Sequence, residues 1–336
     1  MIGRFGLTVI ALLIATASPA AAGPRLDAIK ARGVLNCGVA AAEPGMSRAG
    51  ANGQYVGFEA DLCRSVAIAI FGTAKIAFKP VATLQNFLRG DDIDIVFRGL
   101  TWSFQREAGG PIRFGPIYMH DGQTFLVRAD SGIRTIQALS RRRICLSTDM
   151  FADFLPPLQR HFARANLVLN ARSVQTRAES ERLFFAGECD AVTADASELA
   201  SAVIANGGAP GTYLILTEQI TKEPLAPLLR KGDDQFFDSV RWSLGALIAA
   251  EELGITAKNV DTARTNIADA DIHAFFAAPP AGAGLAPNWT QAIIKQLGNY
   301  GEIFERHLGA ASPARLTRGQ NHLWNQGGLL FAPPVR

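Results

Sequence analysis

Short apolar runs alternate with amphipathic stretches along most of the chain. Amphipathic stretches with helical spacing lie at 57–70 and 235–253, and a shorter one ends at Gly90. Strands alternating with helices are typical of α/β proteins, in which helices cover both faces of a mostly parallel sheet and ligands bind at the carboxyl ends of the strands. The runs that predict strands lie at 34–39, 76–81, 93–97, 123–127, 143–146, 190–195 and 213–220.

The segment after the third of these runs carries candidate ligand contacts. Gly99 and Thr101 are small and leave backbone groups accessible to a ligand. Arg106 offers a planar fork of N–H donors that matches a carboxylate. An isolated arginine beside Glu107 is more often a surface residue. The ligand-binding interpretation therefore depends on the α/β context, which places these residues at the end of a strand.

Polar residues also follow two strands in the middle of the chain. The tripeptide Ser147-Thr148-Asp149 consists of good helix N-caps, so we expect a helix to begin near Met150. Asp195 ends the run at 190–195, where it could contact a ligand, cap the next helix, or do both. These residues join the list of candidate site residues.

The first 22 residues predict an export signal. Arg4 supplies a positive start, residues 7–17 form an apolar core that is too short to span a bilayer, and Ala20-Ala21-Ala22 is a small-residue cleavage motif. An N-terminal membrane anchor is the alternative, but the cleavage motif follows the core at once. We expect cleavage after Ala22 and a soluble protein in a bacterial periplasm.

Composition and motifs narrow the function classes. The formal net charge is +3, and no basic stripe with interleaved aromatic residues appears, so we expect no nucleic-acid partner. The chain contains no P-loop, G-x-G-x-x-G, G-x-S-x-G or H-E-x-x-H pattern. We therefore expect no cofactor and no catalytic residues.

Four cysteines, Cys37, Cys63, Cys145 and Cys189, are an even number in a chain that is predicted to be exported, which indicates disulfides. Three pairings are possible. The local pairing joins Cys37 to Cys63 and Cys145 to Cys189, with one bridge in each half. A metal site is the rival interpretation, but no C-x-x-C spacing occurs and the five histidines are scattered, so we expect no metal.

A collinear set of short stretches runs through the whole chain after the export signal. It comprises ARGVLNCGV (31–39), GFEADLCR (57–64), TWSFQR (101–106), DGQ (121–123), TADAS (193–197), KEPL (222–225), GNYGEIFER (298–306) and GGLLFAPP (327–334). This set resembles the periplasmic amino-acid-binding proteins of ABC transporters, solute-binding protein family 3. The closest resemblance is to the branch that binds general L-amino acids or glutamate, glutamine, aspartate and asparagine.

The resemblance implies a type II periplasmic binding protein with two lobes and two crossing hinge segments. Lobe 1 would comprise residues 26–121 plus 221–336, and lobe 2 residues 122–220. A small-molecule ligand would bind in the cleft of a monomer, stabilise the closed form, and be delivered to an inner-membrane ABC permease. Arg106 would pair with the ligand α-carboxylate and Asp195 with its α-ammonium, while Gly99 and Thr101 would face the ligand.

One departure from the family lies at 147–151. The family usually has Gln-Thr-Gly-Thr-Thr there, which cradles the α-carboxylate at a helix N-terminus, whereas this chain has Ser147-Thr148-Asp149-Met150-Phe151. Unless Asp149 turns outward, its carboxylate would compete with that of a ligand. This predicts weak binding of ordinary L-amino acids.

Two other functions use the same scaffold. An enzyme similar to cyclohexadienyl dehydratase would need a general acid or base in the cleft, and Glu43 or Asp149 could serve. A receptor module would present its ligand to a signalling partner. We expect a transport binding protein rather than an enzyme.

Overall fold

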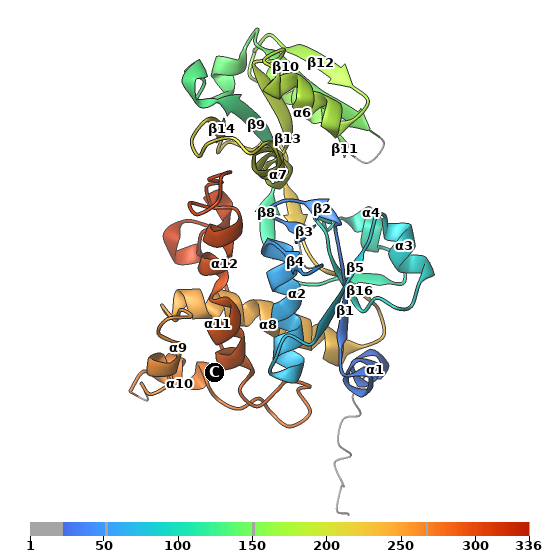
Figure 1. Ribbon diagram of the computed structural model, residues 1–336, viewed down its shortest axis with the longest axis vertical. Helices are drawn as coiled ribbons and strands as arrows, with labels where there is room; N and C mark the ends of the chain where they lie inside the picture. The colour runs from blue at the N-terminus through green and yellow to red at the C-terminus, as the bar shows by residue number, and fades with distance from the viewer. Residues whose placement is uncertain (1–22, 51–52, 150–151, 267, 336) are drawn as a thin grey trace, which may run out of the picture.

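Two sheets, each flanked by helices, form the two lobes of the molecule (Figure 1). The structure is a computed structural model that describes residues 23–50, 53–149, 152–266 and 268–335. The predicted export signal and its cleavage site lie outside these residues. None of the helices in the described ranges is both long and apolar enough to cross a membrane. The predicted two-lobed α/β architecture is confirmed.

The sheet of the first lobe has the strand order β5-β1-β6-β16-β7. Strand β1 pairs in parallel with β5 and β6, as the alternating pattern predicts. Strand β16 pairs antiparallel with both β6 and β7 because the chain enters it after returning from the second lobe. The strands are β1 (Leu35–Val39), β5 (Ile76–Pro80), β6 (Ile95–Phe97), β7 (Ile112–Phe114) and β16 (Leu228–Arg230).

Helix α2 lies at the centre of the first lobe. It packs on β1 and β6 on one side and on α8 and α11 on the other, which explains why nearly all of its side chains are buried. A small antiparallel meander of β2 (Ala42–Glu43), β3 (Ser47–Ala49) and β4 (Tyr55–Val56) lies at the end of this lobe that faces the second lobe (Figure 1). The helices are α1 (Pro24–Arg32), α2 (Phe58–Phe71), α3 (Leu84–Arg89), α4 (Phe104–Glu107), α8 (Asp234–Glu252), α9 (Val260–Ala263), α10 (Ala270–Phe275), α11 (Trp289–Leu297) and α12 (Tyr300–His307).

The sheet of the second lobe has the order β11-β10-β13-β9-β14, and β12 also pairs with β10. Strand β10 is parallel to β12 and β13, whereas β9 is antiparallel to β13 and β14. Helices α5 (Leu155–Arg164), α6 (Arg177–Phe185) and α7 (Ala196–Asn206) complete the lobe. The strands are β9 (Gln123–Arg128), β10 (Arg143–Asp149), β11 (Ala152–Asp153), β12 (Asn170–Val174), β13 (Ala191–Asp195) and β14 (Tyr213–Ile215).

Two neighbouring segments connect the lobes. Strand β8 (Met119–Asp121) leads through Gly122 into β9, and β15 (Glu223–Leu225) leads back toward β16. They pair antiparallel, so the outgoing and returning chains lie side by side. Gly122 allows this close approach, because a Cβ atom there would lie 2.4 Å from the carbonyl oxygen of Thr221.

The four cysteines form two buried disulfides, Cys37–Cys63 and Cys145–Cys189, and the local pairing is confirmed. The first joins β1 to α2 in the first lobe. The second joins β10 to the residue pair that precedes β13 in the second lobe. Each bridge therefore crosslinks elements of a single lobe and leaves relative motion of the lobes unrestricted.

Two local predictions are wrong. The first is the helix predicted to begin near Met150, a residue that itself lies outside the described ranges. Among the described residues, strand β10 continues to Asp149 and pairs antiparallel with β11, and α5 begins at Leu155. Pro156 and Pro157 explain this start, because proline in the first helical turn loses no intrahelical hydrogen bond. The strand predicted at 213–220 ends at Ile215, because the following residues form the approach to β15.

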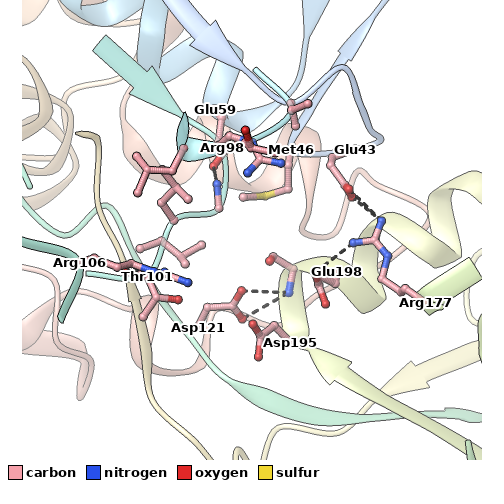
Figure 2. A pocket seen from close by; sticks show the side chains of 18 of the residues that line it. Glu43, Met46, Glu59, Arg98, Thr101, Arg106, Asp121, Arg177, Asp195 and Glu198 are labelled. Carbon is pink, nitrogen blue, oxygen red and sulfur yellow. Dashed lines mark hydrogen bonds and ion pairs between the residues drawn. The ribbon is translucent and has the colours of Figure 1, made fainter. Parts of the chain in front are cut away.

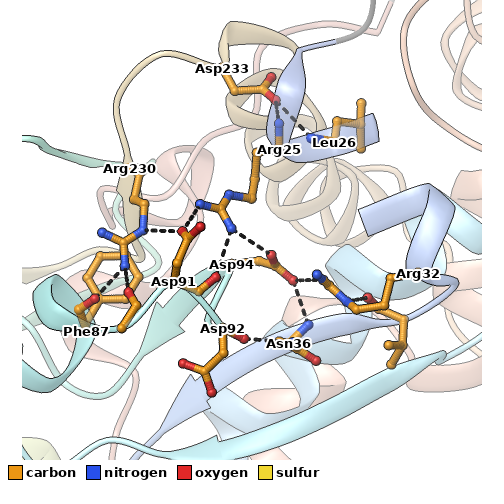
Figure 3. A network of polar contacts seen from close by, with 12 residues as sticks. Arg25, Leu26, Arg32, Asn36, Phe87, Asp91, Asp92, Asp94, Arg230 and Asp233 are labelled. Atoms are coloured by element: carbon orange, nitrogen blue, oxygen red, sulfur yellow. Dashed lines mark hydrogen bonds and ion pairs between the residues drawn. The ribbon is translucent and has the colours of Figure 1, made fainter. Parts of the chain in front are cut away.

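A polar network anchors the amino end of β6, opposite the end that carries the candidate site (Figure 3). The buried Asp94 carboxylate accepts the Asn36 N–H at 2.8 Å and binds the Arg32 guanidinium. Asp233 caps α8 through the Phe236 N–H at 2.7 Å and also accepts two N–H groups from the first turn of α1. These contacts hold α1, α8 and the sheet together as one rigid support.

Candidate functional site

A cavity of about 520 Å³ lies between the two lobes. Strand ends, helix starts and the β2–β3 turn converge on it, as expected for a site at the carboxyl edge of two sheets (Figure 2). Its charged lining residues are Glu43, Glu59, Arg98, Arg106, Asp121, Arg177, Asp195 and Glu198.

Arg106 lines the cavity from α4, and its side chain has no carboxylate partner among the described ion pairs. Its Nη1 donates to the carbonyl oxygen of Thr101 at 2.8 Å. The neighbouring Glu107 is engaged elsewhere, by the Trp102 indole N–H at 2.6 Å and the Phe114 N–H at 3.0 Å. The simple pairing of Arg106 with Glu107 therefore does not occur, and the guanidinium is available to a ligand.

Arg98 is a second cation that lines the cavity without forming an ion pair among the described residues, and sequence reasoning did not single it out. It follows β6 directly, and its buried Nε has no hydrogen-bond partner within the described residues. It also lies close enough to Glu59 to favour the ionised form of that carboxyl group. Together Arg98 and Arg106 make the first-lobe wall attractive to an anion.

Glu59 forms the floor of the cavity from within α2 and is 1% exposed. Its Oε1 accepts hydrogen bonds from the Gly99 N–H and the Tyr118 hydroxyl. Burial raises the pKa of the Glu59 carboxyl to about 7, against the smaller lowering effects of Tyr118, Gly99 and Arg98. Gly99 and Thr101 both line the cavity, but the Gly99 N–H is already engaged by Glu59.

Two aspartates face the cavity where the chain passes between the lobes. Asp195 holds the N-cap position of α7 without making a capping hydrogen bond, and its buried Oδ1 has no partner within the described residues. Asp121, not Asp195, accepts the hydrogen bond from the start of helix α7 that was considered for Asp195 as a helix cap. It accepts the Ser197 N–H in the first turn of α7 at 3.3 and 3.4 Å, and also the Gly122 N–H at 2.9 Å.

The charge of these aspartates is sensitive to their surroundings. Burial raises the pKa of Asp121 to about 6. Burial, reinforced by the nearby Asp121, Glu198 and Glu223 carboxylates, raises the pKa of Asp195 well above its usual range. A ligand ammonium group placed here would stabilise the ionised form of both. The arrangement therefore favours a cationic group at this end of the cavity.

The predicted residues of β10 lie apart from this cavity. Ser147 is buried, and the Thr148 hydroxyl donates to the Val174 carbonyl oxygen at 3.3 Å. Neither residue lines the cavity. The Asp149 side chain, Met150 and Phe151 lie outside what the structure describes, so the predicted competition by the Asp149 carboxylate stays a prediction. Its premise of a helix N-terminus at this position is wrong.

The site has the composition of a binding pocket for a zwitterion. Among the described residues, the guanidinium groups of Arg98 and Arg106 line one wall without an ion-pair partner, and the Asp195 carboxyl group, with an unpartnered Oδ1, lines another. Within the described ranges, no group of three or more His, Cys, Asp or Glu side chains is placed to hold a metal ion.

Comparison with known proteins shows that the chain is similar to transport binding proteins. Residues 35–259 match the family of bacterial extracellular solute-binding proteins, family 3. The chain is 37% identical to the general L-amino acid-binding periplasmic protein AapJ of Rhizobium johnstonii, with 97% of each chain covered. It is 36% identical to the glutamate/glutamine/aspartate/asparagine-binding protein BztA of Rhodobacter capsulatus, covering 99% of this chain and 98% of that protein.

A solved structure is similar to nearly the whole chain. It is an ABC transporter/periplasmic binding protein from Brucella ovis with glutathione bound. It is 34% identical to this chain, with a TM-score of 0.78, and the similarity covers 93% of this chain and 99% of that one. The predicted family resemblance and the predicted fold class are both confirmed by these comparisons.

Proposed function

The chain belongs to the bacterial extracellular solute-binding proteins, family 3, and we propose that it captures an amino acid or a related small zwitterion between its lobes. Delivery to an inner-membrane ABC permease would follow. The observation that carries the proposal is the presence, in one cavity, of the Arg106 guanidinium without an ion-pair partner among the described residues and of the Asp195 carboxyl group, whose Oδ1 has no hydrogen-bond partner among them. A zwitterion needs one fixed cation and one fixed anion that are held apart.

The two connecting segments supply the hinge in this proposal. We assign residues 26–121 and 221–336 to lobe 1 and 122–220 to lobe 2, with β8 and β15 as the crossing segments. Arg106 then lies in lobe 1 and Asp195 in lobe 2. A ligand that touches both favours the closed state, which the permease would bind.

The cellular setting is part of the same proposal. An export signal at 1–22 and a periplasmic location agree with the two disulfides and with the periplasmic relatives, and we include a monomer in the proposal. The named relatives are binding proteins, which supports a function without catalysis. Glu43, considered above as an acid or base, is engaged by Arg177. A turnover assay on any bound ligand separates binding from catalysis.

Replacing Arg106 by alanine tests the carboxylate contact. We expect the Kd of an amino-acid ligand to rise about tenfold to a hundredfold, because a charge-assisted hydrogen bond contributes roughly 1.5–3 kcal/mol and each 1.4 kcal/mol is a factor of ten. Isothermal titration with a panel of L-amino acids and glutathione measures the effect. Arg241→Ala is the control, since Arg241 pairs with Asp238 on the surface of α8. Equal affinity of the Arg106 variant and the wild type would contradict this role.

Ligand affinity should also depend on pH through Asp195. Because the pKa of this carboxyl is raised, it is protonated at low pH and cannot compensate an ammonium group. Affinity should therefore increase from pH 5 to pH 8, and Asp195→Asn should bind more weakly with a flatter profile. Titrations across this range in both proteins measure the difference. Parallel profiles of affinity against pH for the wild type and Asp195→Asn would assign the pH dependence to Asp121 or Glu59 instead.

A further inference from the structure

One ion pair joins the two lobes across the mouth of the cavity. Arg177, the first residue of α6, donates from Nη2 to both carboxylate oxygens of Glu43 on β2, at 2.8 and 2.9 Å (Figure 2). The Ser201 hydroxyl on α7 donates to the same carboxylate at 3.1 Å. Glu43 therefore connects the meander of the first lobe to two helices of the second.

The other partners of Arg177 lie within its own lobe. Its Nε is 3.2 Å from Glu181 on the same helix, and its Nη1 is 3.1 Å from Glu198 on α7. No other ion pair among the described residues joins the two sides of the hinge. Separating the lobes would break the contacts of Glu43 while leaving Arg177 paired with Glu181 and Glu198. Among the carboxylates that pair with Arg177, Glu43 is thus the one whose contacts depend on whether the cleft is closed.

We propose that Glu43 and Arg177 form an inter-lobe latch that holds the ligand-free cleft partly closed and positions the cavity walls for a ligand. The proposal rests on the hinge closure of the proposed function. Both side chains keep 29% of their surface exposed, so water competes with the contact. The latch therefore shifts the balance between open and closed forms modestly and does not lock the cleft. A ligand needs less interaction energy to complete closure from this starting point.

Because Glu43 and Arg177 have different charged neighbours, substituting each of them should open the cleft to a different extent. Glu43→Gln removes one charge but keeps an oxygen that can accept from Ser201 and Arg177. Arg177→Gln leaves three carboxylates, those of Glu43, Glu181 and Glu198, facing each other without a cation, so repulsion should open the cleft further. Glu43→Gln is the cleaner test, because the second lobe retains its internal ion pairs.

The test measures lobe separation without any ligand. Spin labels on unnatural amino acids at the exposed positions Arg89 in lobe 1 and Val168 in lobe 2 report the distance distribution by pulsed EPR and leave both disulfides intact. We expect the ratio of open to closed molecules to rise about two- to fivefold in Glu43→Gln, as for a partly exposed ion pair. The matched control is Glu188→Gln, which removes the ion pairs of Glu188 with Arg172 and Arg182 within the second lobe and should change nothing.

Salt and ligand provide independent readouts. Raising the salt concentration should open the wild type, because ions screen the pair, but should leave Glu43→Gln unchanged. Unchanged distance distributions in both latch variants would overturn the proposal, whether or not a solute binds. If a ligand is found, its Kd should rise in Glu43→Gln by the factor that the closed population falls. A shifted distribution with unchanged affinity would refute the positioning role.

Discussion

Replacing both Cys145 and Cys189 by alanine is expected to lower the free energy of unfolding by about 4 kcal/mol. The bridge closes a loop with a sequence separation of 44, and its loss restores the chain entropy of that loop to the unfolded state. Both cysteines are buried, so truncation also removes packing in the second lobe. Urea unfolding of the wild type and the double variant under oxidising conditions measures the loss.

The bridge of the first lobe offers a matched comparison. Its sequence separation of 26 predicts a slightly smaller loss, about 3.5 kcal/mol, for the Cys37→Ala/Cys63→Ala protein. Each pair lies within one lobe, so the variants should destabilise different parts of the molecule. Protection from hydrogen exchange should fall mainly in the lobe that loses its bridge. A loss below 1 kcal/mol in either variant would show that residual unfolded-state structure replaces the constraint.

Replacing Glu59 by glutamine should stabilise the protein at pH 8 by up to about 3 kcal/mol, since each unit of pKa shift corresponds to 1.36 kcal/mol. Burial raises the pKa of Glu59 from 4.5 to about 7. A raised carboxyl pKa gives stability that is fully present below pH 4.5 and is lost as pH rises through about 7. The glutamine carbonyl can still accept from Gly99 and Tyr118 but carries no charge to bury.

Urea unfolding at pH 5 and pH 8 tests this expectation. The wild type should lose stability between these values more steeply than Glu59→Gln, and the difference between the two proteins should shrink to about 1 kcal/mol or less at pH 5. Glu188→Gln serves as a surface control, because that carboxylate is well exposed and should change neither value. Parallel pH profiles for Glu59→Gln and the wild type would show that Arg98 and the two hydrogen bonds already compensate the ionised carboxylate.

Of the eight charged residues that line the cavity, sequence reasoning singled out Arg106 and Asp195 as ligand contacts and Glu43 as a candidate acid or base, and it missed the others for a physical reason. Arg106 lies in α4 after β6, and Asp195 is the last residue of β13, so both stand out as polar groups near a strand end in an α/β context. Arg98 directly follows β6 and Asp121 is the last residue of β8, and that position was their available signal. The missing hydrogen-bond partner of Arg98 Nε among the described residues depends on what surrounds it in the fold. The contact of Asp121 with Ser197 in α7 joins two segments that are distant in the sequence.

The sequence by itself predicted most strands and the long helices, the local disulfide pairing and the family. Apolar periodicity marks the strands and long helices because burial of one face depends on spacing alone. The local pairing was one of three that the four cysteines allow, and the collinear motifs indicate the family. The start of the helix after β10 was misjudged because good N-cap residues also fit the end of a strand, and the prolines after Leu155 decided where α5 begins.

Only the tertiary structure decided which charges compensate one another. Glu43 and Arg177 are 134 positions apart, and no local pattern predicts that they meet across the cleft. The chain crosses between the lobes twice, and this topology brings α6 and α7 against the β2–β3 meander. Burial at that junction then raises the pKa of Glu59, Asp121 and Asp195. Desolvation of a carboxyl group depends on its neighbours in space and not on its neighbours along the chain.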